Sequence, residues 1–413
     1  MSHPQKVAVL LCGYGEVETY EDFADYNERA LRLLASKFIK FPDFTIPWIA
    51  KALEVFDRRE WSQQDNYQSP HNEIFHAQRT GLEKALQRRY GDRVEVFTAF
   101  NFCESYLPHQ VLQTIREKGF EKLVIFPLLV VDSIYTCGLA LQQINEALGD
   151  DADWLKDMRY LPSFGHLPDY QQRVADHIEA RLSTLETSCA PSQIGIVLMN
   201  HGCPMDNKGF EGGIRDSEDL YRGVRDRLIN RYPLISIGWM NHQTPGQWTT
   251  PDVDLAAQNL LTMGAKALVF VPIGFVTENH ETMLDVAYSI SKLRLQVECL
   301  HVDCLNDDPG FLELCAGWLD PLIAEIAELP QMDSADIPAV IPPAGTQPNR
   351  NQNICDRLAP HLQKGHSHHG HSHGHSHSHG SGHSHGNDRS HDHGHSHKKR
   401  RHDHHHHNGH HHH

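Results

Sequence analysis

Two polar side chains that follow apolar runs are the first candidates for chemistry in this chain. The segment IGIVLMNHGCP carries His201 at the end of one run, and the segment FVPIGFVTENHETML (270–284) places Glu281 after another. If the two runs are neighbouring parallel strands, both side chains reach the same edge of a sheet. An imidazole beside a carboxylate can relay protons near neutral pH or bind a borderline divalent metal ion. Asp285 follows Glu281 by four residues and would share its helical face.

The surrounding pattern predicts the elements that position these groups. Short apolar runs rich in Val, Ile and Phe alternate with amphipathic segments such as HQVLQTIREKGF and VDLAAQNLLTMGA, a pattern typical of buried parallel strands with crossover helices. The runs are VAVLLCGYG (7–15), VEVFTAFNF (94–102), KLVIFPLLVV (122–131), IGIVLMNHG (194–202), ISIGWMNHQ (235–243) and ALVFVPIGFV (267–276).

The first three runs resemble the last three. In each set the first run ends on a glycine-containing turn, the second ends in an Asn-containing loop, and the third contains an internal Pro, in FPLL and VPIG. We therefore expect an α/β fold of two similar Rossmann-like lobes, 1–190 and 191–329, each with a parallel sheet of about four strands flanked by helices. Ligand is expected in a cleft between the lobes, at the carboxyl ends of the strands.

The composition changes near residue 330. Residues 330–360 are rich in Pro, Asn and Gln and are expected to form an extended linker. Residues 361–413 contain 24 of the 34 histidines, which predicts a disordered metal-binding tail. Its imidazoles suit Zn²⁺, Ni²⁺, Cu²⁺ and Co²⁺ and bind Fe²⁺ less selectively. The terminal His run could be an expression tag, but the preceding His residues, interrupted by Ser and Gly, do not resemble one.

Charge and cysteine content restrict the class of protein. A formal net charge of −16 argues against nucleic acid as a partner. No apolar stretch is long enough to cross a bilayer, and the start MSHPQKVAVLLCGYG lacks the layout of a cleavable signal. Nine cysteines without a CxxC pair indicate reduced thiols and a cytoplasmic location. The spacing does not favour an iron–sulfur cluster formed by Cys299, Cys304, Cys315 and Cys355.

An insertion at 36–75 separates the first strand from the next helix. Its first part, SKFIKFPDFTIPWIAKALEVFDRREW (36–61), is rich in Phe, Ile and Trp. Two interpretations are open: ordinary capping of the core, or an apolar lip that covers a flat ligand or contacts a membrane surface.

Six motifs, in order over about residues 5–325, resemble those of ferrochelatase, the enzyme family that inserts iron into protoporphyrin. The segments are CGYGEVETYEDFADYNERALR with Tyr14, YQSPHNEIFHAQRTGLEKAL with Ser69 and Pro70, FPLLVVDSIYTCGLAL with Ser133, Thr136 and Gly138, LPSFGHLPDY, NHGCP with His201, and GFVTENHETML with Glu281.

The resemblance implies roles for individual residues. It makes His201 and Glu281 the catalytic pair, and the metal is expected at His201, Glu281 and Asp285. The positions expected to bind the tetrapyrrole are Tyr14, Ser69, Ser133, Thr136, and Trp248 and Pro251 of TPGQWTTPDV. No organic cofactor is expected and no GxxxxGK phosphate loop is present. The divalent metal is itself a substrate: Fe²⁺, with Co²⁺, Ni²⁺ and Zn²⁺ as alternatives.

Three positions depart from the family pattern. Asn101 stands where the family has an Arg, Asp132 replaces an aromatic residue, and Ser289 ends the carboxylate row that begins with Glu281 and Asp285. These changes weaken inference about contacts with the tetrapyrrole side chains and about an outer metal site.

The expected reaction is insertion of a divalent metal into a bent tetrapyrrole in heme biosynthesis, with His201 as proton acceptor. One alternative is a cobalt or nickel chelatase that acts on a more carboxylated ring such as sirohydrochlorin. Another is a non-catalytic metal store or metallochaperone built on a chelatase fold, which would have no need of the His201–Glu281 pair. A periplasmic-type binding protein is disfavoured by the missing signal and by the reduced cysteines.

Overall fold

The computed structural model describes residues 6–17, 23–35, 41–62, 68–149, 152–185, 187–242, 246–293, 296–328, 343–345 and 349, without the side chains of 56–62. The predicted tail at 361–413, most of the predicted linker, and Cys355 lie outside the described residues.

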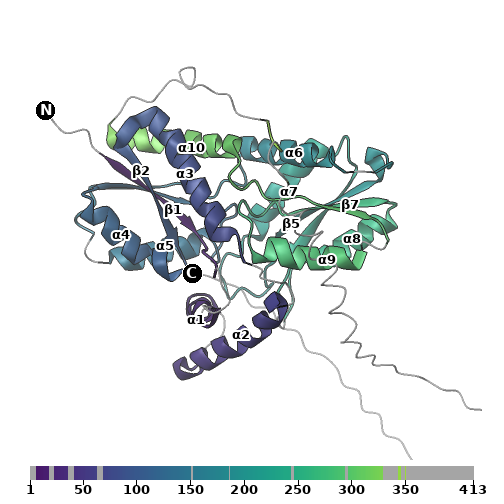
Figure 1. The fold of residues 1–413 in the computed structure, drawn as a ribbon, viewed down its shortest axis with the longest axis horizontal. Coiled ribbons are helices and arrows are strands. Elements are labelled where there is room, and N and C mark those ends of the chain that lie inside the picture. Colours follow the sequence, from purple (N-terminus) through teal and green to yellow (C-terminus); the bar gives the residue numbers. More distant parts are fainter. Residues whose placement is uncertain are drawn as a thin grey trace, which may run out of the picture. The chain divides into compact units, whose positions relative to one another are not determined.

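Two four-stranded parallel sheets form the framework of the protein (Figure 1). The strand order is β2-β1-β3-β4 in the first sheet and β6-β5-β7-β8 in the second, so the two sheets have the same topology. This confirms the prediction of an α/β fold with two similar lobes. The strands are β1 (Val7–Gly13), β2 (Val94–Phe100), β3 (Lys122–Pro127), β4 (Asp157–Tyr160), β5 (Ile194–His201), β6 (Leu234–Met240), β7 (Ala267–Val271) and β8 (Glu298–His301).

The six predicted runs all form strands, but β4 and β8 had no counterpart in the sequence analysis. Both are edge strands of four residues, DMRY and ECLH, without a continuous apolar run. The prolines expected inside the third run of each set lie at strand ends instead. Pro127 closes β3, and β7 ends immediately before Pro272. Proline lacks the N–H that a central strand needs, which explains these positions.

Helices cover both faces of each sheet (Figure 1). Two of them, α4 and α8, coincide with the amphipathic segments singled out in the sequence. Across the described residues, no helix combines the length and apolar character needed to span a membrane. The helices are α1 (Phe23–Leu33), α2 (Ile46–Ser62), α3 (His71–Tyr90), α4 (Pro108–Glu117), α5 (Cys137–Leu148), α6 (Pro168–Leu182), α7 (Ile214–Leu228), α8 (Val253–Thr262), α9 (Val286–Leu293) and α10 (Pro309–Ala327).

Alternation along the strands divides the core into three clusters. In β1, Val7 and Val9 belong to one cluster, whereas Ala8 and Leu10 face another that includes residues of α4 and α5. Val197 of β5 belongs to a third cluster with residues of α8 and α9. The first cluster contains residues of both sheets together with α3, α6, α7 and α10. The two lobes therefore share one hydrophobic core.

The last helix crosses between the predicted lobes. Helix α10 lies within the predicted C-terminal lobe (191–329), yet it packs against α3, α6 and strands β1, β3 and β4 of the first sheet. The chain thus returns to the first sheet after completing the second. The lobe boundary near residue 190 stays a prediction, since the shared core does not divide there.

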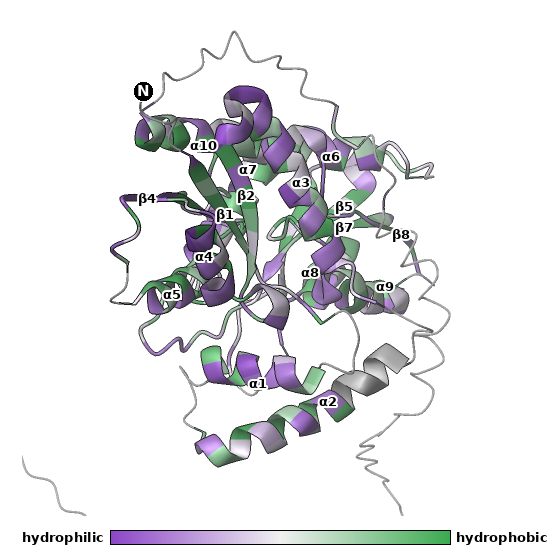
Figure 2. Ribbon diagram, turned by 60° about the vertical axis from the view of Figure 1, so that its left-hand side comes forward, coloured by the Kyte–Doolittle hydropathy of each residue, from purple (hydrophilic) through white to green (hydrophobic). Residues whose placement is uncertain are grey.

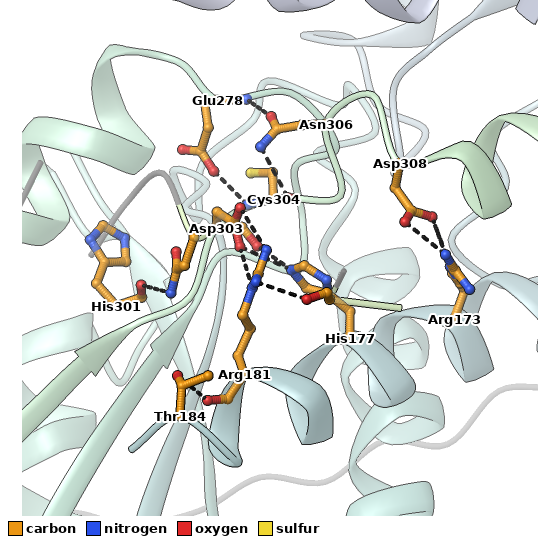
Figure 3. A network of polar contacts seen from close by, with 12 residues as sticks. Arg173, His177, Arg181, Thr184, Glu278, His301, Asp303, Cys304, Asn306 and Asp308 are labelled. Atoms are coloured by element: carbon orange, nitrogen blue, oxygen red, sulfur yellow. Dashed lines mark hydrogen bonds and ion pairs between the residues drawn. The ribbon is translucent and has the colours of Figure 1, made fainter. Parts of the chain in front are cut away.

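A buried polar network fixes the loop that leads from β8 to α10 (Figure 3). Asp308 accepts three hydrogen bonds from Arg173 of α6, two at Oδ1 (2.5 Å and 2.8 Å) and one at Oδ2 (2.7 Å). It also accepts the N–H of Phe311 at 2.8 Å as the N-cap of α10. Five residues earlier, Asp303 accepts a hydrogen bond from Arg181 at 2.9 Å. The loop is thereby tied to α6 by two charged pairs.

Candidate active site

His201 and Glu281 lie together because they follow adjacent strands. Strands β5 and β7 pair in parallel, with Leu198 opposite Val271, so their carboxyl ends meet at one edge of the second sheet. His201 is the last residue of β5, and its Nε2 lies 3.7 Å from Oε1 of Glu281. The two side chains are 40% and 25% exposed, so both groups are accessible to a substrate.

Glu281 begins a turn of π-helix that leads into α9. The turn spans Glu281–Asp285, and the N–H of Val286 donates to the carbonyl of Glu281. Such wide turns occur frequently at functional sites. Asp285 ends the turn, and its charge contributes to the electrostatic environment of His201. Within the described residues, however, Asp285 is not a member of the three-residue group of donors described below.

The backbone fixes the tautomer of His201. Its Nδ1 lies 2.6 Å from the carbonyl oxygen of Gly202. A carbonyl oxygen can only accept, so Nδ1 carries the hydrogen and the neutral ring presents a lone pair at Nε2, on the side of Glu281. This is the form that can accept a proton or bind a metal ion.

Electrostatic coupling shifts the pKa values of the two groups in opposite directions. Burial alone would lower the pKa of His201, but the Glu281 carboxylate outweighs it and raises that pKa above its ordinary value. Burial alone would likewise raise the pKa of Glu281, but the neighbouring imidazoles, above all His201, lower it to about 2. Glu281 is therefore ionised at neutral pH and stabilises positive charge beside it.

A second imidazole, His242, completes the group and was not predicted. Its Nε2 lies 3.6 Å from the same Oε1 of Glu281. One donor atom from each of His201, His242 and Glu281 can be chosen so that all three lie within 4.8 Å of one another. The signal was present in the sequence, because this histidine is the penultimate residue of the run ISIGWMNHQ, which contains most of β6, the strand that pairs with β5.

The residues expected to bind the tetrapyrrole fall into two groups. In the first, the hydroxyl of Tyr14 donates to the carbonyl of Tyr135, between Ser133 and Thr136. The hydroxyls of Ser133 and Thr136 lie 2.9 Å apart. Burial raises the pKa of Tyr14, and the negative charge of Glu281 adds to the effect. The first group thus lies within electrostatic reach of Glu281.

The second group consists of Trp248, Pro251 and Ser69, each of which contacts a different residue. The ring of Trp248 meets His242 edge-on at 5.7 Å between centroids. The carbonyl of Pro251 accepts the N–H of Trp239 at 3.0 Å, next to the end of β6. Ser69 is buried and donates to the carboxylate of Glu16. The substrate-binding roles of all these residues stay predictions.

Two further carboxyl groups, those of Glu16 and Glu278, lie close to the segment that carries Glu281. Glu16 accepts the backbone N–H of His280 at 3.1 Å, and burial raises its pKa to about 7. Glu278 is fully buried, accepts hydrogen bonds from Thr282 and from the N–H of Cys304, and also has its pKa raised to about 7 by burial. Glu278 stands in the segment quoted first, but nothing in the sequence separates its buried position from the exposed one of Glu281.

The departures from the family pattern occupy distinct environments. Asn101 is buried at the end of β2, and its N–H donates to the carbonyl of Gly13 at 3.0 Å. Asp132 is exposed, and its pKa is raised by partial burial and by the charges of Asp216 and Glu211. Neither belongs to the group of donors around Glu281.

The predicted apolar insertion forms a helix with one exposed apolar edge. Within α2, Ile46 and Ala50 are buried, and helix α1 packs against α2. Phe44, just before α2, and Trp48 are each 77% exposed. Figure 2 shows hydrophobic and hydrophilic residues alternating along this helix. Residues 36–40 of the insertion lie outside the described residues.

Comparison with known proteins matches most of the chain to the family that its motifs resemble. A family model described as Ferrochelatase matches residues 6–321. The ferrochelatase of Synechococcus elongatus is 28% identical over 346 residues, covering 80% of this chain and 85% of the relative. That of Gloeothece citriformis is 26% identical over 326 residues, covering 75% and 81%. Among solved structures, SirB from Bacillus subtilis with Fe³⁺ aligns with a TM-score of 0.42 at 10% identity, over 79% of this chain and 100% of that one.

Proposed function

The chain belongs to the ferrochelatase family, and from this premise we propose that His201 and Glu281 drive the insertion of Fe²⁺ into protoporphyrin IX. Insertion of a divalent metal ion into a tetrapyrrole for heme synthesis is the activity of the family. The specific metal, the specific ring and the roles of the residues form our proposal.

Metal insertion requires two separate operations. The hydrated cation must lose water, and two N–H bonds of the free tetrapyrrole must break, so that one divalent ion replaces two protons. A flat ring shields its inner nitrogens, and a protein that binds the ring bent exposes their lone pairs. A base close to the ring must then accept each proton.

His201 is the base in this proposal. Its Nε2 lone pair is set by the hydrogen bond from Nδ1 to the carbonyl of Gly202. Protonation gives an imidazolium that the ionised Glu281 stabilises, since the carboxylate raises the pKa of His201. A general base of this kind contributes roughly 100-fold to 10,000-fold to a rate.

The observation that supports the proposal most is the 3.7 Å approach of His201 Nε2 to Glu281 Oε1. The two residues come from neighbouring strands and are partly exposed at the strand ends, where α/β folds bind their ligands. A non-catalytic metal store would have no need for a base whose protonated form is stabilised in this way.

Absorption spectroscopy of purified full-length protein tests the proposal. Protoporphyrin IX or sirohydrochlorin is mixed without oxygen with Fe²⁺, Co²⁺, Ni²⁺ or Zn²⁺, and the shift of the tetrapyrrole bands is followed. We expect turnover with Fe²⁺ and protoporphyrin that falls at least about 100-fold in His201→Ala. A matched change of an exposed imidazole, His109→Ala on α4, should have no effect.

The outcomes separate the alternatives. Turnover of sirohydrochlorin with Co²⁺ or Ni²⁺ in place of protoporphyrin would favour the chelatase variant that Asn101 and Asp132 suggest. Absence of turnover with every pair, together with tight metal binding, would favour a metal store. Wild-type rates in both His201→Ala and Glu281→Gln would refute the proposed mechanism.

We also propose that segment 36–61 makes a peripheral contact with a membrane surface. The proposal is supported by Phe44 and Trp48, which place large apolar side chains in solvent at the start of α2. Sedimentation with phospholipid vesicles should detect the contact, and Trp48→Gln should weaken it. Equal sedimentation of both proteins would contradict it.

A cytoplasmic location is likewise our proposal. It is supported by the eight cysteines in the described residues, all of which are free thiols. Fractionation of the producing cells would test it, and recovery of the protein from an oxidising compartment would contradict it.

A further inference from the structure

Glu281 faces two imidazoles with a single oxygen atom. Its Oε1 lies 3.7 Å from Nε2 of His201 and 3.6 Å from Nε2 of His242. The rings of the two histidines meet at an angle of 64° with centroids 5.0 Å apart, so they converge without stacking. Two imidazole nitrogens and a carboxylate oxygen therefore surround one small volume.

The backbone holds His242 in this position. The N–H of Gly202 donates to the carbonyl of Met240 at 2.8 Å, which joins the ends of β5 and β6. Asn241 then donates to the carbonyl of Thr249 at 2.8 Å and accepts the Thr249 hydroxyl at 3.1 Å. A β-carbon at Gly202 would lie 1.9 Å from Oδ1 of Asn241, so the glycine permits this close approach. Asn241, the residue next to His242, is thus held by Thr249 on one side and packed against Gly202 on the other.

The donor spacing suits a metal ion. Bonds of about 2.1 Å from a metal to imidazole nitrogen and carboxylate oxygen connect donors that lie about 3 to 4 Å apart. The separations of 3.6 Å and 3.7 Å fall in this range. His201 also meets the usual condition for a metal ligand, since its second nitrogen donates to a backbone carbonyl and leaves Nε2 free to bind.

From these observations we propose that His201, His242 and Glu281 together bind the divalent metal substrate, with His242 as the third ligand. This inference rests on the proposed function and adds a metal-binding residue to it. Two imidazoles and one carboxylate on one side of a cation form the arrangement that suits Fe²⁺ while leaving its other coordination positions open.

The partial exposure of the three ligands is consistent with a site that transfers its metal ion to the tetrapyrrole. The side chains are 40%, 51% and 25% exposed for His201, His242 and Glu281. The open positions of a bound cation can therefore accept pyrrole nitrogens while the protein ligands still hold its other side. As four ring nitrogens replace the three protein donors, two N–H bonds break, and the two protons pass to Nε2 of His201 and Nε2 of His242, which the departing cation has freed.

Kinetics at controlled metal concentration test this role. A chelating buffer sets free Zn²⁺, which keeps the histidines of the tail from distorting the free concentration, and insertion into protoporphyrin is followed in full-length protein. His242→Phe keeps a ring against Trp248 but removes the ligand. We expect its KM for free Zn²⁺ to rise about tenfold or more, with the KM for protoporphyrin unchanged. His242→Glu restores a ligand and should recover part of the loss, whereas His109→Ala should match wild type.

A structure with bound metal gives an independent reading. Crystals of the full-length wild-type protein are soaked with Co²⁺, and anomalous scattering locates the ion. We expect a peak bonded to His201, His242 and Glu281. A peak bonded to His201 and Glu281 with His242 turned away, or a wild-type KM for Zn²⁺ in His242→Phe, would overturn the inference.

Failure of the inference and failure of the proposed function are distinguishable. Normal turnover that does not depend on His242 would refute the role of His242 as third ligand but would not refute the chelatase function. If Co²⁺ is bonded to all three ligands but the protein turns over no tetrapyrrole, the metal site is supported and the proposed function is refuted.

Discussion

Glu281 organises the site at the scale of single residues. With a pKa of about 2 it stays ionised, and its oxygen faces the imidazoles of His201 and His242. A carboxylate in this position stabilises either a proton on His201 or a cation between the rings. In our proposal Glu281 therefore serves both operations of metal insertion, proton removal and metal delivery.

The sequence was sufficient to predict that His201 and Glu281 lie close together, because each follows an apolar run and the two runs belong to one set. His242 was not predicted although it lies next to the end of such a run, because the predicted pair already accounted for the expected chemistry. The hydrogen bond from the N–H of His280 to Glu16 joins residues 264 positions apart. No spacing rule predicts a contact of that kind, since it depends on how the two lobes meet.

The effect of burial on a carboxyl group next to the site can be tested at Glu278. Burial raises its pKa in the folded protein to about 7, above the ordinary 4.5, so the folded state binds a proton that the unfolded state releases. The contribution of this proton to the free energy of unfolding is fully present below pH 4.5 and is lost as the pH rises through 7. We expect the free energy of unfolding of wild type to fall, relative to Glu278→Gln, by on the order of 3 kcal/mol between pH 4.5 and 8.

Urea denaturation followed by circular dichroism at several pH values measures this difference. The exposed Glu121→Gln should show no comparable pH dependence relative to wild type. A constant difference between wild type and Glu278→Gln across this range would show that Glu278 is ionised in the folded protein.

At the scale of elements, apolar runs predicted the central strands and the edge strands β2 and β6, but missed the short edge strands β4 and β8. A strand buried on both faces is a continuous apolar run, and β1, β3, β5 and β7 fit this description. The edge strands β4 and β8 have four residues each and owe their structure to pairing with β3 and β7. The return of α10 to the first sheet was also not predictable, because its apolar surface would suit either lobe.

Asp308 connects α6 to α10 and should be important for stability. It pairs with Arg173 of α6 and caps α10, and both side chains are almost completely buried. Asp308→Asn removes the charge opposite a buried guanidinium, which costs about 3 to 5 kcal/mol of unfolding free energy in comparable pairs. Chemical denaturation measures the loss.

An exposed pair serves as the control for this prediction. Asp254 and Lys292 lie 2.7 Å apart but are 45% and 39% exposed, so Asp254→Asn should cost less than about 1 kcal/mol. Equal losses in Asp308→Asn and Asp254→Asn would mean that the α6 network does not stabilise the fold.

At the scale of the whole molecule, a shared core joins the two lobes, and the His-rich sequence lies at one end of the chain. One cluster of buried residues includes both sheets, so the strand ends that carry Tyr14 and Glu281 are held on a common framework. The composition of residues 361–413 shows that the histidines outside the site are concentrated at one end of the chain. We propose that tethered imidazoles change the concentration of metal available to the site, either by delivering metal or by retaining it.

The tail is expected to modulate insertion without being required for it. Deletion of 361–413 should leave the insertion rate at saturating metal within about twofold of wild type, because His201 and Glu281 remain in place. At limiting metal, the rate should fall if the tail delivers metal and rise if the tail retains it. The measurement is the rate of the tetrapyrrole band shift across a metal titration, and a complete loss at saturation would contradict this view.

The central claim is that His201 and Glu281 act as one unit in metal insertion. The most direct test is a double-mutant cycle on the insertion rate of Fe²⁺ into protoporphyrin at saturating concentrations, with His201→Ala, Glu281→Gln and the combined variant. If the two side chains form one proton-accepting unit, the combined variant should be scarcely slower than His201→Ala alone. Fully multiplicative losses in the combined variant would show that the two residues act independently and would contradict the claim.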